Sequence, residues 1–243
     1  RDDHYFLRDP DAGTVIVLLD GEDRAGCGSE WREDQGDAAG AEGIDCRKEG
    51  KNMEYLAHID GDREQSVKEH LQGTAELAEK FAAKFRKADW GYCCGMLHDI
   101  GKYSAEFQKK IKENLDIRVD HSTAGAKVCE NLDGCYWLLT YCIAGHHAGL
   151  PDLGREGLPS SLLGRLKKRL CDYSAYEKEI EIPQITTPPI AMNPEKDPNF
   201  ALSVFIRMLY SCLVDADFLD TEQFMNNGTV QRDSGESMDG LLE

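Results

Sequence analysis

The sequence predicts an all-α protein: a helical bundle with an irregular acidic extension at its N-terminal side. Two observations support this class. Between about residues 66 and 219, apolar side chains recur at three- to four-residue spacing, which is the period of helices buried on one face. Within the first 52 residues, one short run, Thr14–Leu19, has the continuous apolar character of a β-strand.

Composition divides the chain into three parts. Residues 1–52 hold 14 Asp and Glu against 7 Lys and Arg and show no helical period beyond that one strand, so we expect a largely irregular acidic extension. Residues 53–225 carry the periodic apolar pattern and form the expected folded domain. Residues 226–243 are polar and contain Gly, Ser and Asp, as in a tail or linker.

Capping and breaking residues delimit the expected helices. Ser66 and Glu69 form the Ser-x-x-Glu pattern of a capping box, in which each side chain binds a backbone N–H at the start of a helix. An almost wholly apolar helix is expected at about 136–146, before the helix-breaking Gly-Leu-Pro at 149–151. Other helices are expected at about 90–99, 104–112, 121–132, 160–173 and 199–219, with an extended Pro-rich connection at 183–198.

The chain is acidic, with a formal net charge of −17. Affinity for duplex DNA comes largely from Lys and Arg that replace counterions, so this balance counts against a protein that grips duplex DNA by a broad basic surface. It does not exclude a nuclease, because bound metal ions can contact the scissile phosphate while a partner delivers the strand. No apolar run is long enough to span a membrane, and no membrane partner is expected.

Nine cysteines occur without a CxxC pair, and two of them, Cys93 and Cys94, are adjacent. An odd count without a recognisable secretory signal indicates reduced cysteines. We therefore expect a cytoplasmic protein without disulfides or a cysteine-bound zinc ion.

Histidines and aspartates suggest a metal centre. The adjacent pair His98-Asp99 lies near the end of a predicted helix, where an imidazole nitrogen and a carboxylate oxygen can reach one cation. Asp215 follows the apolar run 212–214 in the last helix, and a buried carboxylate there needs a partner, which a metal ion would supply. Four further histidines lie in or beside predicted helices: His70, His121, His146 and His147.

Taken in sequence order, these His and Asp residues closely resemble the motifs of the HD nuclease of type I CRISPR systems. The sequence around them is most similar to the I-C type. The resemblance covers about residues 55–222 and implies a helical bundle of the HD-domain type. The stretches that carry it are SVKEHLQGTAELAEKF, GMLHDIGKYSAEFQKKI, DHSTAGA, AGHHAGLPDL and LYSCLVDADFLDTE.

The resemblance implies two divalent metal ions with Asp99 bridging them. Two cations about 3.5–4 Å apart can clamp the attacking and leaving oxygens of an in-line displacement. The identity of the ions stays open among Mn, Ni, Co, Fe and Mg, although histidine-rich sites suit the transition metals better than Mg. One ion would be held by His70, His98, Asp99 and Asp215, and the other by Asp99, His121, His146 and His147.

Two residues beside Asp99 are candidates for catalysis. Lys102 is placed to hold a phosphate oxygen, although a cation at a helix C-terminus is also favoured by the helix dipole. Ser211, one turn before Asp215, is placed to contact the same phosphate, or to bond back to a helix carbonyl. His58 is expected to pack or cap near the start of the domain, or to line the cleft.

The resemblance implies a hydrolase, a deoxyribonuclease or endonuclease that cuts single-stranded DNA in CRISPR interference, an antiviral defence. Its implied partners are single-stranded DNA, a helicase domain or subunit, and the CRISPR surveillance complex. The alternative is an HD-type phosphohydrolase of nucleotides or cyclic nucleotides, since two-metal phosphodiesterases have equivalent sites. A non-catalytic adaptor is disfavoured, because a scaffold has no need for so many convergent polar residues in an apolar core.

Overall fold

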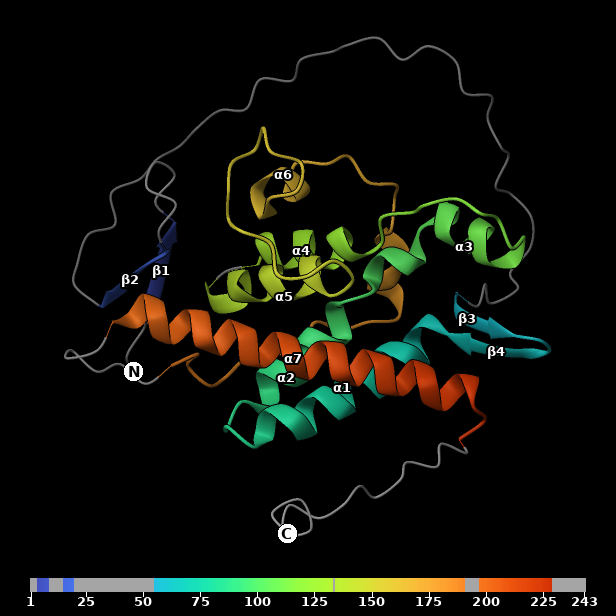
Figure 1. Ribbon diagram of the computed structural model, residues 1–243, viewed down its shortest axis with the longest axis horizontal. Helices are drawn as coiled ribbons and strands as arrows, with labels where there is room; N and C mark the ends of the chain where they lie inside the picture. Colours follow the sequence, from blue (N-terminus) through green and yellow to red (C-terminus); the bar gives the residue numbers. More distant parts are fainter. Residues whose placement is uncertain (1–3, 9–14, 20–54, 133, 191–196, 229–243) are drawn as a thin grey trace, which may run out of the picture.

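The computed structural model describes residues 4–8, 15–19, 55–132, 134–190 and 197–228. Helices dominate these residues, so the prediction of an all-α bundle is confirmed (Figure 1). The elements are β1 (His4–Arg8), β2 (Val15–Leu19), β3 (Leu56–Asp60), β4 (Arg63–Ser66), α1 (Val67–Ala83), α2 (Ala88–Leu97), the 3₁₀ helix η1 (Ile100–Tyr103), α3 (Ala105–Lys112), α4 (Ser122–Glu130), η2 (Gly134–Leu138), α5 (Leu139–Gly145), α6 (Leu162–Leu166), η3 (Ser174–Lys178) and α7 (Pro198–Met225).

Helix α1 begins at the predicted capping box. The backbone N–H of Glu69 donates to Ser66 Oγ at 3.2 Å, and the backbone N–H of Ser66 donates to Glu69 Oε2 at 2.9 Å. These reciprocal bonds satisfy two donors that a helix start otherwise leaves unpaired. The face of α1 that carries Leu71, Ala75 and Ala78 is fully buried, as the apolar period predicts.

Two glycines allow α2 to approach α1 closely. A Cβ added at Gly91 would lie 2.3 Å from the carbonyl oxygen of Ala78, and one at Gly95 would lie 2.5 Å from Cα of Ala75. Because glycine has no Cβ, the two backbones can pack at this short distance. This packing fixes the C-terminal end of α2, which leads directly into the His98-Asp99 pair.

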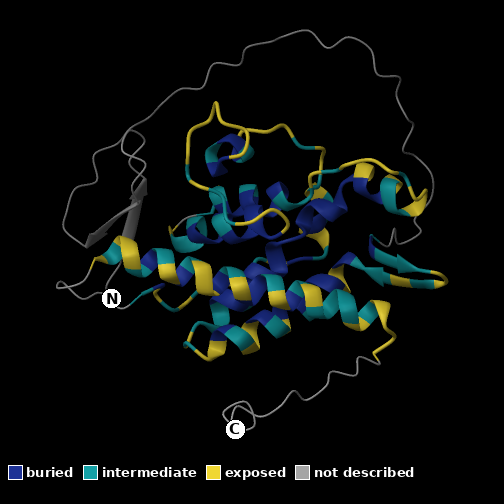
Figure 2. Cartoon of the chain, viewed as in Figure 1, coloured by how far each residue is buried: buried dark blue, intermediate teal, exposed yellow. Residues whose placement is uncertain are grey.

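Helix α7 runs along the bundle and packs against α1, α2 and α5 (Figure 1). Asp197 caps its start by accepting from the N–H of Asn199, and Pro198 occupies the first turn, where a missing N–H costs nothing. Its inner face is buried and its outer face is exposed, as the stripes along it show in Figure 2. In the described part of the chain, no helix combines the length and the apolar character needed to cross a membrane.

A small antiparallel hairpin, β3–β4, precedes α1 and was not predicted. Gly61 has φ +60° in its turn, a conformation that glycine adopts at little cost. Arg63 of β4 reaches the far end of the chain: its guanidinium donates to the carbonyl oxygens of Phe224 and Met225 at 2.8 and 3.0 Å. A cation is favourable at these unpaired carbonyls of the α7 C-terminus, so the hairpin and α7 stabilise each other.

The predicted strand at Thr14–Leu19 is present as β2, but it pairs with a second strand, β1, in antiparallel register. The backbone thus forms two strands where one was expected. The remainder of the predicted irregular extension, residues 1–3, 9–14 and 20–52, lies outside the described residues, as does most of the predicted tail, residues 229–243.

Two predicted helices are shorter than expected. The apolar segment at 136–146 divides into η2 and α5, and the segment at 160–173 contains only α6. Leu162 and Leu166 of α6 are buried, but residues 167–169 are exposed cations. Lys127 donates to the carbonyl oxygen of Lys168, so a side chain takes the place of a continuing helical bond.

Before α7 begins, the Pro-rich connection has no helix or strand where described, and it is tied to α2. Asp89 accepts the backbone N–H groups of Thr186 and Thr187, both at 2.8 Å. Trp90, which is fully buried, donates its indole N–H to the carbonyl oxygen of Thr187 at 2.9 Å. These bonds hold the chain against the bundle between α6 and α7.

Candidate metal centre

The His98-Asp99 pair lies where α2 ends. His98 is the C-terminal cap of α2, and Asp99 has φ −115° and ψ 24° before η1 begins. Adjacent residues of a continuous helix point about 100° apart, so this break is what lets both side chains face one point. Nε2 of His98 lies 3.4 Å from Oδ2 of Asp99, and both residues are buried.

Three histidines share an arrangement that fixes their ring nitrogens. In each, Nδ1 bonds a backbone carbonyl oxygen two or three residues earlier, at 2.7 Å for His98 and His146 and at 3.1 Å for His121. A carbonyl accepts only from a protonated nitrogen, so the hydrogen is assigned to Nδ1. The lone pair of Nε2 therefore faces the centre and is available to a metal ion.

His70 of α1 is oriented by a carboxylate instead of a carbonyl. Its Nδ1 lies 2.8 Å from Oδ2 of Asp220, which also accepts from Nε2 of Gln65 at 3.0 Å. A Cβ at Gly73 would lie 1.9 Å from Oδ1 of Asp220, so only glycine leaves room for this carboxylate. A carboxylate behind a ligating histidine fixes its ring and raises its basicity.

The first group of potential ligands consists of His70, His98, Asp99 and Asp217. Nε2 of His70 lies 3.3 Å from Asp99 Oδ2 and 3.4 Å from Asp217 Oδ1. Nε2 of His98 lies 3.4 and 3.5 Å from the same two oxygens. Two imidazoles and two carboxylates therefore converge from α1, the end of α2, and α7.

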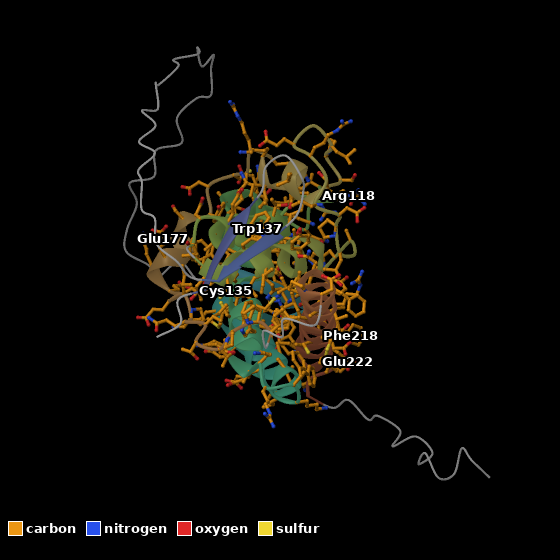
Figure 3. All side chains as sticks on the ribbon, turned by 90° about the vertical axis from the view of Figure 1, so that its left-hand side faces the viewer. Arg118, Cys135, Trp137, Glu177, Phe218 and Glu222 are labelled. Carbon is orange, nitrogen blue, oxygen red and sulfur yellow. The ribbon has the colours of Figure 1, made fainter. Side chains whose placement is uncertain are left out.

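The structure corrects the prediction for Asp215: Asp217 supplies the carboxylate from α7. Asp215 is exposed and belongs to neither group, because two residues along a helix turn the side chain by about 200°. Ser211 is also exposed and does not reach the centre. Both lie on the outer face of α7, which continues through Phe218 and Glu222 at helical spacing; Figure 3 labels these two side by side on that helix.

The second group consists of Asp99, His121, His146 and His147. Oδ1 of Asp99 lies 3.2 Å from Nε2 of His146 and 3.6 Å from Nε2 of His121. The Nε2 atoms of His121 and His147 are 2.8 Å apart. Asp99 thus faces the first group with Oδ2 and the second with Oδ1, which is the arrangement a bridging carboxylate needs.

The adjacent residues His146 and His147 both reach the second group because α5 ends at Gly145. His146 is the C-terminal cap of α5, and the N–H groups of Ala148 and Gly149 both donate to the carbonyl oxygen of Gly145 at 2.8 Å. Gly149 then takes φ +87°, a conformation that favours glycine. This tight turn is the helix end that the sequence predicts there.

Three buried ligand atoms have no hydrogen-bond partner: Nε2 of His98, Oδ1 of Asp99 and Nε2 of His146. A buried polar atom left unsatisfied costs about 1–3 kcal/mol. All three belong to the two groups, and their N and O donors are of the type that binds divalent transition metals. The residues present therefore fit divalent metal binding.

The carboxylates of the centre are held ionised. Burial alone would raise the pKa of Asp99, but the Lys102 cation and the surrounding histidines hold it well below its usual value. Burial would likewise raise the pKa of Asp217, but its close contacts with His70 and His98 lower that pKa. Burial opposes protonation of His70, yet hydrogen bonds to three aspartates raise its pKa to about 9.

The second group behaves differently. Burial lowers the pKa of His121. The ring of His147 is exposed on one side but packs against His121 and His146, and partial desolvation together with His146 lowers its pKa to about 4. His146 is the exception, since its contact with Asp99 outweighs burial and raises its pKa. Neutral imidazoles are the form that binds metal, so two of these three ligands need not lose a proton at neutral pH.

Lys102 lies inside the centre, as predicted. Its side chain is buried, and Nζ lies 2.8 Å from Oδ2 of Asp99. It also lies 5.8 Å from the centroid of the Phe107 ring. The ion pair with Asp99 compensates for the burial of the charge.

Sequence reasoning missed Asp217 and Asp220. For Asp217 a signal was present: it follows the buried residues Leu209 and Leu213 at steps of four, which places it on the inner face of α7. For Asp220 there was none, because a carboxylate that acts through His70 is recognised only from their distance.

Residues 67–176 match the HD domain family. The match covers α1 through most of η3 and contains every histidine of the two groups, but it ends before α7 and Asp217. A search of curated proteins finds no match. Residues 67–176 are thus similar to HD domains, whose members are typically metal-dependent hydrolases, and the helical architecture and the His-Asp centre agree with this similarity.

Proposed function

We propose that this protein is a metal-dependent nuclease that hydrolyses phosphodiester bonds of single-stranded DNA in CRISPR interference. The observation that carries the proposal is the pair of ligand groups that share Asp99, one through each carboxylate oxygen. Two cation sites bridged by one carboxylate suit an in-line displacement at phosphorus. The resemblance of the ligand motifs to the type I CRISPR nuclease supports DNA as the phosphodiester.

The roles of the ligands follow from their placement. His70, His98 and Asp217 would hold one ion. His121, His146 and His147 would hold the other ion, and Asp99 would contact both. Divalent ions bound there would supply Lewis-acid activation of water and phosphate. Asp99 and Asp217 are suited to hold cations, because their pKa values are lowered and both carry negative charge at neutral pH.

Lys102 supplies a positive charge that does not depend on metal loading. Its ammonium nitrogen lies beside Oδ2 of Asp99, the carboxylate oxygen that faces the first ligand group. We propose that it binds a non-bridging phosphate oxygen and offsets the negative charge that develops in the transition state, which is where a fixed cation contributes most to rate.

The net charge of −17 bears on how the strand arrives. A chain this acidic lacks the counterion-release affinity of a DNA-gripping surface. We therefore propose that a helicase domain or subunit, acting with the CRISPR surveillance complex in the cytoplasm, feeds single-stranded DNA to the centre. Access is open on the side of His147, which is exposed.

The proposal is tested with the full chain loaded separately with Mn, Ni, Co, Fe and Mg and incubated with single-stranded DNA. We expect cleavage with at least one transition metal, since the centre is rich in histidine, and loss of cleavage on Asp99→Asn. Asp215→Asn makes the same chemical change at a carboxylate that is exposed and belongs to neither ligand group, so it serves as the control.

Nucleotides and cyclic nucleotides are the second set of substrates. Hydrolysis of these by a metal-loaded chain that leaves single-stranded DNA intact would contradict the nuclease proposal and favour the small-molecule phosphohydrolase. Cleavage of DNA by Asp99→Asn at the wild-type rate would show that the bridged centre is not the active site.

A further inference from the structure

A histidine outside both ligand groups also lies at the centre. His58 is on β3, and its Nε2 lies 3.2 Å from Nζ of Lys102 and 3.5 Å from Oγ1 of Thr221. Its ring packs edge-on against His70, with the centroids 4.7 Å apart. The HD domain match begins at residue 67, so this side chain comes from the hairpin that precedes the matched domain.

His58 acts here as a hydrogen-bond acceptor. The lysine ammonium has three N–H groups and no acceptor capacity, so Nε2 of His58 must accept from Lys102. Asp99 Oδ2 accepts a second N–H. The third N–H has no acceptor among the described residues and remains available to a phosphate oxygen.

One side chain ties the strand that carries His58 to the backbone of Lys102. Oε1 of Gln108 accepts the backbone N–H of Leu56 at 2.9 Å, and its Nε2 donates to the carbonyl oxygen of Leu56, also at 2.9 Å. The same Nε2 donates to the carbonyl oxygen of Lys102 at 2.8 Å. Gln108 is buried, so it ties the strand of His58 and the backbone of Lys102 to one fixed amide.

Two other roles fit His58 less well. It belongs to neither ligand group, and the Lys102 ammonium beside its Nε2 would repel a metal ion at that atom. A histidine with a purely structural role would not need to place its acceptor nitrogen beside the ammonium of Lys102. The contact therefore indicates a role in positioning that ammonium.

We propose that His58 is a positioning residue, which together with Asp99 holds the Lys102 ammonium so that its remaining N–H faces the substrate phosphate. The proposal rests on the proposed function for its catalytic consequence, but the contact itself can be tested without activity. The β3–β4 hairpin, which precedes the residues matched by the HD family, would thereby contribute to catalysis.

The test compares His58→Leu, which removes the acceptor at similar volume, with His58→Gln, whose Oε1 can accept in place of Nε2. In the full metal-loaded chain acting on single-stranded DNA, we expect His58→Leu to lower kcat about 10- to 100-fold, the scale of a misplaced catalytic group. KM, metal content and Tm should stay close to wild type, and His58→Gln should recover most of kcat. Adding His58→Leu to Lys102→Ala should cause no further loss, since both remove one unit.

A second measurement does not need turnover. The ¹⁵N imidazole signals of the metal-free chain should show His58 protonated on Nδ1 and unprotonated on Nε2, and the Nε2 signal should shift on Lys102→Ala. An inactive wild type that keeps this signature would refute the nuclease proposal while upholding the His58–Lys102 contact. Wild-type kcat in His58→Leu, multiplicative losses in the double variant, or a protonated Nε2 would overturn the inference.

Discussion

The two halves of the metal centre differ in burial and charge. In the first, the His70 and His98 side chains are fully buried and Asp217 adds a carboxylate to the shared Asp99. In the second, Asp99 is the sole carboxylate of the group, and His147 is exposed. We therefore expect the first half to bind a cation tightly and the second to exchange its cation readily.

The elements that carry the ligands explain this difference. His70 and Asp217 lie within long helices that pack against each other, and Asp220 holds the His70 ring from behind. His121 and His147 instead lie just outside helices, before α4 and after α5. Packed helices hold ligands in a fixed geometry, while residues at helix ends have fewer neighbours and move more readily.

The largest effect is expected for Asp99→Asn, because this residue serves both halves. We expect loss of both ions and a fall in DNA cleavage of at least about 10³-fold, equivalent to the several kcal/mol that Lewis-acid activation supplies. The Asn oxygen can still accept from Lys102, so the fold should survive. Elemental analysis measures the loss of the ions, and Tm measures whether the fold survives. Retention of both ions would refute the claim that the two ions share Asp99.

Asp217→Asn is expected to remove the first ion and leave the second. Its effect on affinity should exceed the 10- to 100-fold range typical of residues that only support a ligand. Asp215→Asn, on the exposed side of the same helix, should bind metal as wild type does. Isothermal titration of both variants with the metal ion measures their affinities. A larger loss of affinity in Asp215→Asn than in Asp217→Asn would indicate that Asp215 is the ligand.

His147→Ala should act on the second half alone. We expect weaker binding of the second ion by about 100-fold, with the first ion retained, and cleavage restored by a higher metal concentration. Activity as a function of metal concentration measures the shift. If His147→Ala emptied both sites, the two halves would not be separable as described.

The smallest effect is expected for Asp220→Asn, which leaves every ligand in place. Loss of the carboxylate behind His70 should lower the binding affinity for the first ion about 10-fold, at the lower end of the range for residues that support a ligand. Wild-type affinity in this variant would mean that packing alone orients His70.

Much of the fold and part of the centre could be predicted because local signals were strong. The capping box at Ser66, the apolar period of α1 and the break after His146 each depend on neighbours within one or two turns. The His98-Asp99 pair was recognisable because ligands that are adjacent in sequence at a helix end are adjacent in space.

The rest depends on tertiary distance. Asp215 and Asp217 are two carboxylates on one helix, and only the phase of α7 against the bundle decides which points inward. The β3–β4 hairpin is short and gains stability from Gln108 and from the end of α7, both remote in sequence. Asp220 and His58 act through His70 and Lys102, so neither has a motif of its own.

The central claim is that two cations share Asp99, and anomalous diffraction from crystals soaked in Mn²⁺ tests it most directly. The account predicts two peaks, one on each side of the Asp99 carboxylate, with the peak beside His147 fading first as Mn²⁺ is diluted. A single peak, or a second peak away from Asp99, would contradict it.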